Sequence, residues 1–108
     1  MRGVERLLRD LRTGLLAVAS LKVLVERGPM HGYGVRLVLG ELLGWEPPES
    51  SVYDALKRLE RLGLAESYWV RSSMGTLRKY YKATPRGVEA LEDLVAEARR
   101  LMSWLVCR

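Results

Sequence analysis

The apolar positions of the first half of the chain recur at helical spacing in consecutive segments. A stripe between residues 4 and 11 repeats every three or four residues, and residues 15–26 are apolar nearly all round. The second pattern is typical of a helix that is buried on most sides. Thr13-Gly14 lies between the two patterns and is a candidate interruption. Gly28-Pro29 then predicts the end of this helical region.

Two further helices are predicted before residue 63. Residues 32–43 carry the first of them, and its expected core positions are Val35, Leu37, Val38, Leu39, Leu42 and Leu43. Pro47 and Pro48 keep the chain extended, so that the next helix runs from about Glu49 to Leu62. Gly63 follows at a position that suits a left-handed residue after a helix.

The hydrophobic period changes after Gly63. The segments LAESYWV and LRKYYKA are short and rich in tyrosine, and the loop RSSMGT separates them, which predicts a β-hairpin. Thr84 and Pro85 then supply a cap and a first-turn proline for a last helix. The fold class is therefore mainly α with a small hairpin, in the order of a winged helix-turn-helix domain. We expect residues 1–84 to form this domain and residues 85–108 a dimerisation helix, together in one compact unit.

The third predicted helix has two chemically different sides. An apolar stripe of Val52, Ala55, Leu56, Leu59 and Leu62 faces one way, and the opposite arc holds Ser50, Tyr53, Asp54, Lys57 and Arg61, with Arg58 at its margin. A recognition helix needs this division, because one side anchors it and the other meets DNA. The alternative is an ordinary surface helix with a polar arc, and the carboxylate of Asp54 counts against a contact with phosphate.

The second hairpin segment also alternates. Leu77, Lys79, Tyr81 and Ala83 share one side and Arg78, Tyr80 and Lys82 the other. We expect Tyr81 and Ala83 to pack over the third helix and the second set to face outward, with Arg71 across the hairpin. These cations would meet DNA phosphates, although hairpins also carry charge for solubility alone. Because the cationic hairpin is expected to lie next to the cationic side of the third helix, each strengthens the DNA-binding interpretation of the other.

Charge and composition add a few limits. The chain has 108 residues and a formal net charge of +5, with 48% hydrophobic and 29% charged residues, which is typical of one soluble domain that favours an anionic partner. Its single cysteine, Cys107, cannot form an internal disulfide. With no targeting pattern or membrane-spanning segment, we expect a cytoplasmic protein. No nucleophile–base grouping or paired carboxylates can be built, so neither an enzyme nor a cofactor is predicted.

Four ring side chains have both structural and functional interpretations. His31 stands beside glycines and has no second metal ligand near it, so we interpret it as a residue that starts a helix or makes a core hydrogen bond. Tyr33, Trp45 and Trp69 are interpreted as packing residues.

The last predicted helix carries two apolar lines. Val88, Leu91, Val95, Ala98, Met102 and Leu105 follow heptad spacing, and Ala90, Leu94, Leu101 and Trp104 form a second line. One line can pack on the parent domain while the other meets a partner, because both together would expose a large apolar patch. We expect a two-fold dimer completed by Val4, Leu8 and Leu11, and the alternative is that both lines fold back on one monomer.

Three motifs together resemble the PadR family of transcriptional regulators, in its compact type with a single C-terminal helix. They are GPMHGYGV (28–35), SSVYDALKRLERLGL (50–64) and RKYYKATPRG (78–87), in the family's order. The resemblance implies a homodimeric winged-helix repressor, with Ser50, Ser51 and Tyr53 on the recognition helix and residues 78–81 in a basic wing. This sequence departs from the family pattern at Pro48, where a capping serine is common, and at Asp54, where proline is common. Some compact relatives bind flat aromatic compounds between tryptophans of paired C-terminal helices, and Trp104 is the matching candidate here.

The hypothesis is thus a transcriptional repressor that binds double-stranded DNA, with a palindromic operator. The expected DNA-binding residues are Ser50, Ser51, Tyr53, Lys57, Arg58, Arg61, Arg71, Arg78, Lys79, Tyr80 and Lys82. The expected dimerisation residues are Leu8, Leu11, Leu91, Leu94, Val95, Ala98, Leu101, Met102 and Leu105. A winged-helix module that binds protein and not DNA is the alternative function.

Overall fold

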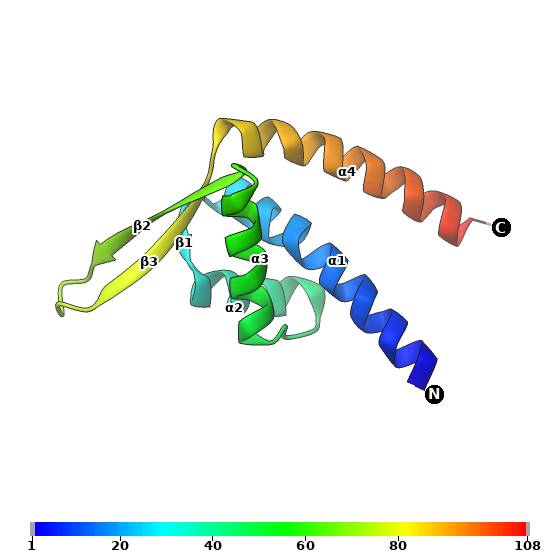
Figure 1. The fold of residues 1–108 in the computed structure, drawn as a ribbon, viewed down its shortest axis with the longest axis horizontal. Coiled ribbons are helices and arrows are strands. Elements are labelled where there is room, and N and C mark those ends of the chain that lie inside the picture. Colours follow the sequence, from blue (N-terminus) through cyan, green and yellow to red (C-terminus); the bar gives the residue numbers. More distant parts are fainter. Residues whose placement is uncertain (1, 108) are drawn as a thin grey trace.

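The computed structural model describes residues 2–107, which form four helices and three strands (Figure 1). Along the chain these are α1 (Arg2–Arg27), β1 (Met30–His31), α2 (Gly32–Leu43), α3 (Glu49–Arg61), β2 (Ala65–Arg71), β3 (Leu77–Ala83) and α4 (Pro85–Val106). The predicted class, mainly α with a small β element in winged-helix order, is confirmed.

Helix α1 runs without a break through Thr13 and Gly14, so the interruption considered there does not occur. A glycine inside a helix costs only about 1 kcal/mol relative to alanine, which the surrounding hydrogen bonds of a long helix offset. Burial is confined to the second half, where Leu16, Ser20, Leu21, Val23 and Leu24 are buried. The first half stands clear of the core.

The sheet has three strands in the order β1-β3-β2, one more than the predicted hairpin. Strand β1 is only two residues long and pairs Met30 with Tyr81 and His31 with Tyr80. Two residues are too few to show a period, which is why the sequence pattern did not predict this strand. Its pairing fixes the start of α2 against the hairpin.

The core lies where α1, α2 and α3 meet the base of the sheet. Its fully buried side chains include Leu21, Val35, Leu56 and Tyr81. Of the six core positions expected on α2, Leu37, Leu42 and Leu43 are exposed, because this short surface helix buries only the Val35–Leu39 line completely. The expectation for Leu62 is also wrong: this residue caps the end of α3 and is 54% exposed.

The root of α4 is fastened to the turn after α3. Thr84 caps α4, as predicted, by accepting a 3.0 Å hydrogen bond from the Gly87 amide. The Thr84 hydroxyl also donates to the Gly63 carbonyl at 2.7 Å, and Gly63 has the expected positive φ of 76°. A Cβ atom on Gly87 would lie 2.0 Å from the Leu64 carbonyl oxygen. Glycine is therefore required at position 87, because the backbone of Leu64 approaches too closely for a side chain.

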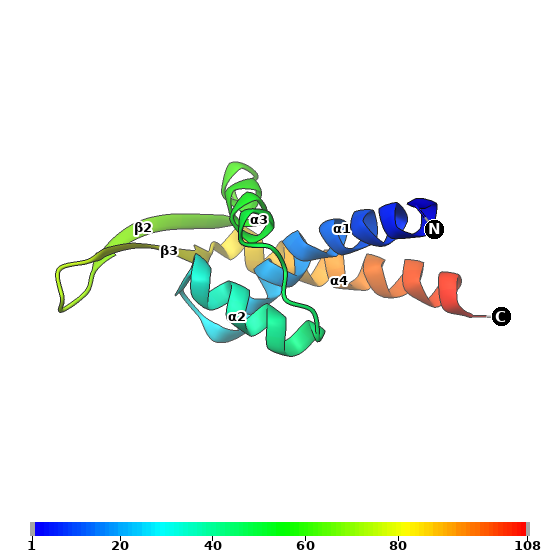
Figure 2. The ribbon, with the colours of Figure 1, turned by 90° about the horizontal axis from the view of Figure 1, so that it is seen from below.

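The first half of α1 and the second half of α4 extend away from the hairpin (Figures 1 and 2). Together with the hairpin they give the molecule extents of 54 × 33 × 23 Å. Both ends carry exposed leucines, among them Leu7 and Leu101. Across residues 2–107, no helix combines the length and apolar character needed to cross a membrane.

Candidate nucleic-acid interface

Helix α3 shows the two-sided division expected from its sequence. Val52, Ala55, Leu56 and Leu59 are buried, while the opposite side exposes Ser50, Asp54, Lys57, Arg58 and Arg61. Pro48 occupies the cap position and offers no side-chain hydrogen bond; its carbonyl accepts from the Ser51 and Val52 amides instead. The departure at Pro48 therefore does not prevent the helix from starting at Glu49.

One face of the hairpin is fastened to α3. The Ser67 hydroxyl on β2 donates to the Glu60 carboxylate at 2.5 Å, and Tyr81 on β3 is 1% exposed. Burial, with Glu60 and Tyr53 nearby, raises the pKa of Tyr81 above its usual 10.0. Tyr81 therefore remains an uncharged packing group, as predicted, and sets the angle between the helix and the hairpin.

Tyr53 is held between α3 and the start of α2. A Cβ atom on Gly32 would lie 2.4 Å from a ring carbon of Tyr53, so this close approach requires glycine. Tyr53 is half-buried, with the rest of its surface on the groove between α3 and the hairpin.

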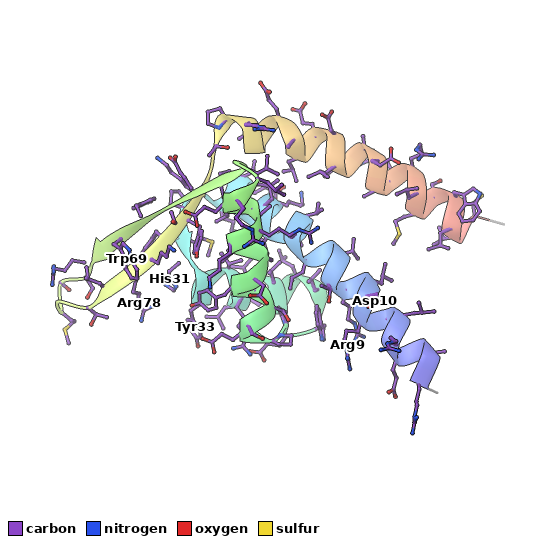
Figure 3. The ribbon with its side chains drawn as sticks, in the orientation of Figure 1. Arg9, Asp10, His31, Tyr33, Trp69 and Arg78 are labelled. Carbon is purple, nitrogen blue, oxygen red and sulfur yellow. The ribbon has the colours of Figure 1, made fainter. Side chains whose placement is uncertain are left out.

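That groove has a volume of about 550 Å³ and collects side chains from α2, α3 and the hairpin. Its lining residues are His31, Gly32, Tyr33, Tyr53, Lys57, Trp69, Leu77, Arg78, Lys79 and Tyr81. Three of these are cations and none is acidic. Figure 3 shows Trp69 and Arg78 on the hairpin, with His31 between them and the body of the domain.

The strand register separates the predicted wing residues into two faces. Arg71 pairs with Leu77, so it shares the groove face with Lys79 and does not join Arg78 across the hairpin, as had been expected. The other face holds Arg78, Tyr80 and Lys82, although the Arg78 side chain also lines the groove. There Tyr80 stacks with Tyr68, with ring centres 6.1 Å apart, and the Lys82 ammonium pairs with Glu66 at 3.2 Å.

The tryptophans differ from one another. Trp45 is half-buried, with the Arg12 guanidinium 5.2 Å from its ring centre, which agrees with a packing role. Trp69 is 64% exposed and lies opposite Lys79, so its interpretation as a packing residue is wrong. Tyr33 is likewise 49% exposed at the groove. Alternation along β2 would have placed Trp69 on this face, but not its exposure.

The remaining helix residues face α1. Ser51, Asp54, Arg58 and Arg61 line a smaller groove of about 350 Å³ between α1 and α3. Within the described chain, none of the ion pairs involves Asp54, so the pairing with Lys57 or Arg58 that would mask its charge is not formed. Helix α3 thus carries cations toward both grooves, and the exposed carboxylate of Asp54 lies in the groove beside α1.

His31 performs the structural role expected of it. Its Nδ1 atom accepts a 3.0 Å hydrogen bond from the Gly34 amide and so caps α2. Its Nε2 atom lies 3.2 Å from Nη1 of Arg78, and its ring meets Tyr80 edge-on at 5.5 Å. Burial, and secondarily the charge of Arg78, lower the pKa of His31 below its usual 6.5.

The predicted dimerisation residues also divide. Leu91 lies in the core of its own chain at 9% exposure and leaves little surface for a partner. Val95 and Ala98 are half-buried, whereas Leu8, Leu11, Leu94, Leu101, Met102 and Leu105 are exposed. Between α1 and α4 lies an apolar groove of about 430 Å³, lined by Asp10, Leu11, Gly14, Leu15, Ala98, Leu101, Met102, Trp104 and Leu105.

Three helices, a hairpin and a cationic groove between them define a winged-helix domain of the kind found in transcriptional regulators. The model of the transcriptional regulator PadR-like family matches residues 21–93, and this chain belongs to that family.

Solved structures give the same assignment. A PadR family transcriptional regulator from Eggerthella lenta has 29% identity and a TM-score of 0.81, over 94% of this chain and 88% of the other. A PadR-like transcriptional regulator from Bacillus cereus has 28% identity and a TM-score of 0.72, over 90% and 92%. Bacillus subtilis PadR, in complex with operator DNA, has 28% identity and a TM-score of 0.67, over 75% of this chain and 46% of its own. A comparison with curated proteins found no match.

The capping role of His31 makes stability depend on pH. Folding lowers the pKa of His31, so the unfolded chain binds more protons than the folded chain. The contribution of His31 to the free energy of unfolding is therefore complete above pH 6.5 and is lost as the pH falls through the pKa of the folded state. Denaturant unfolding at about pH 7.5 and about pH 5.5, on either side of an ordinary histidine pKa, should show this loss. His31 is the single histidine, so His31→Asn, which keeps a capping oxygen, should show a smaller pH dependence. Equal pH dependence in both proteins would contradict the assignment.

Proposed function

We propose that the protein is a cytoplasmic, homodimeric, sequence-specific DNA-binding repressor. The carrying observation is the groove between α3 and the hairpin, whose lining includes Lys57, Arg78 and Lys79 but, within the described chain, no carboxylate. A concave surface of one charge sign attracts a polyanion. The complex of the related Bacillus subtilis PadR with operator DNA supports DNA as that polyanion.

In this proposal α3 enters the major groove and the hairpin lies along the neighbouring backbone. Ser50, Ser51 and Tyr53 are nearest to the duplex, and the phosphate contacts come from Lys57, Arg58, Arg61, Arg71, Arg78 and Lys79. Phosphate contacts fix the position of the protein, while sequence is distinguished at the base edges. Tyr80 and Lys82 leave the expected set because, unlike Arg78, neither lines the groove, and Lys82 is paired with Glu66.

The proposed dimer forms through α1 and α4. Leu101, Trp104 and Leu105 are at least half exposed beside the apolar groove, with Trp104 at 78%. Such a surface is unfavourable in water, and a second copy of α4 supplies a matching apolar stripe. Two-fold symmetry then makes the operator palindromic, with half-sites about 34 Å or a multiple of it apart.

A small aromatic effector is part of the same proposal. Trp104 lines the apolar groove, and most of its ring is accessible. An indole offers a flat apolar face on which a planar molecule stacks. A ligand held there would lie between the helices that pair the two subunits.

The first prediction from the proposed function concerns the phosphate contacts on α3. Lys57→Ala with Arg61→Ala should weaken DNA binding at low salt by about tenfold or more, and should lower the slope of log affinity against log salt by about 2, because each phosphate contact releases counterions. A gel-shift or anisotropy titration at several salt concentrations measures both quantities.

A matched control removes the same charge elsewhere. Lys22→Ala with Arg27→Ala takes two cations from exposed positions of α1, away from the grooves of α3, and should leave affinity nearly unchanged. Equal affinity of the folded α3 double variant and the wild type would refute these contacts. If the wild-type protein is not retained on duplex DNA or heparin even in dilute buffer, the result would favour the alternative of a winged-helix module that binds protein.

The second prediction concerns the dimer. Leu101→Glu places a charge in the groove between α1 and α4 and should convert the dimer to a monomer in sedimentation or light-scattering experiments. Leu42→Glu, a similar change at an exposed leucine of α2, should leave the dimer intact. A wild type that is monomeric, or a Leu101→Glu dimer of unchanged affinity, would contradict the proposed interface.

The third prediction concerns the effector. A planar aromatic dye should quench tryptophan emission in the wild type but not in Trp104→Ala, because quenching requires stacking on that indole. Trp69→Ala, which removes an exposed tryptophan far from the groove between α1 and α4, should retain the quenching. Equal quenching in the wild type and in Trp104→Ala would remove the proposed site.

A further inference from the structure

His31 occupies a junction between three elements. It is the last residue of β1, its side chain caps α2, and it pairs with Tyr80 of β3. Its Nε2 atom lies on the surface beside the exposed Arg78. The proposed DNA contacts described above include Arg78 but not His31.

The capping hydrogen bond determines where the imidazole carries its proton. Nδ1 accepts from the Gly34 amide at 3.0 Å, so Nδ1 cannot itself bear a hydrogen. A neutral imidazole has one N–H, which must then be on Nε2. The guanidinium of Arg78 is also only a donor, and its Nη1 lies 3.2 Å from that nitrogen. The Nε2–H group of His31 and the guanidinium of Arg78 are therefore two hydrogen-bond donors that face each other with no acceptor between them.

The opposite tautomer would relieve this contact at a higher cost. It would set an N–H on Nδ1 against the Gly34 amide and leave a partly buried amide of the first helical turn without an acceptor. Arg78 is exposed and can hydrogen-bond to water when it turns away. Protonation of both nitrogens would break the same cap, and the lowered pKa of His31 agrees with this. The hydrogen bond from the Gly34 amide to Nδ1 therefore determines the tautomer, and the contact between Nε2 and Arg78 does not.

We propose that His31 Nε2–H and the Arg78 guanidinium together bind one phosphate of the DNA backbone. The inference rests on the DNA-binding function proposed above and assigns to it a residue outside the recognition helix. A phosphate oxygen accepts hydrogen bonds from both groups, so that it satisfies the two donors that otherwise oppose each other. Lys57 and Lys79 line the same groove and add to the positive potential there.

The imidazole is fixed before any phosphate arrives. Its cap bond holds one edge, Tyr33 stacks at 6.3 Å with nearly parallel rings, and Tyr80 approaches edge-on at 5.5 Å. Figure 3 shows His31 between Tyr33 and Arg78. A donor that is already oriented loses little conformational entropy on binding. Because the imidazole is neutral, it adds a hydrogen bond without releasing a counterion, whereas Arg78 contributes to the salt dependence.

The test combines protein variants with neutralised phosphates. The DNA is a duplex that the wild type selects from a random pool, prepared with a methylphosphonate at one backbone position at a time. His31→Asn keeps an acceptor for the Gly34 amide and removes the Nε2 donor. It should lower affinity by about tenfold, the effect of losing a hydrogen bond to a charged group, without changing the salt slope.

One methylphosphonate position should reveal the shared contact. Neutralising that phosphate should weaken the wild type and have little further effect on His31→Asn or on Arg78→Gln, because the contact is already lost. Arg78→Gln leaves the cap intact and should also lower the salt slope by about 1. Nitrogen-15 NMR of the imidazole should show Nε2–H and an unprotonated Nδ1, with and without DNA.

Four results would overturn the inference. The first is an imidazole that carries its proton on Nδ1, and the second is a His31→Asn protein that melts like the wild type and binds DNA with unchanged affinity. The third is that the losses of affinity from the protein variants and from the methylphosphonate add at every phosphate position. The fourth is an imidazole that responds to inorganic phosphate while no methylphosphonate position affects binding. In each of these cases the wild type still binds duplex DNA, so the proposed function stands. A wild type that selects no duplex would remove the function and the inference together.

Discussion

The orientation of the domain depends on the apolar stripe of α3. Val52, Leu56 and Leu59 lie against α1 and the base of the sheet, and Tyr81 closes the space between the helix and the hairpin. Since the same helix carries the exposed cations, burying one side determines where the other side points. The Ser67–Glu60 hydrogen bond and the Gly32–Tyr53 approach then leave α3 little freedom relative to the hairpin and α2. The cationic groove is a consequence of this packing.

Much of this arrangement could be predicted from residue patterns. The stripe on α3, the Thr84 cap, the inward Tyr81 and the capping role of His31 all follow from local rules, because spacing and chemical type decide them. The two-residue strand β1 could not be predicted, since its existence depends on a partner strand far along the chain. The continuity of α1 through Gly14 was undecided for a similar reason, because propensity alone is a weak guide within a long helix.

The site was less predictable than the fold. Alternation correctly separated the two faces of β3, but the face that meets α3 depends on the register of both strands, which moved Arg71 to the groove side and left Lys82 with Glu66. The exposure of single side chains was harder to predict. Trp69 and Leu62 have apolar side chains of a type usually found in a core, and yet both are exposed. Position in a sheet or at a helix end overrides residue type in both cases.

The unbroken course of α1 has a mechanical consequence. Twenty-six residues at 1.5 Å each make a rod of about 39 Å, seated by its second half in the core and free along its first half. The free half borders the apolar groove with Trp104, while the seated half lies under α3. With the second half held, a tilt of about 5° moves the far end of the free half, about 20 Å away, by about 2 Å. One continuous helix therefore lines both the apolar groove beside Trp104 and the groove beside α3.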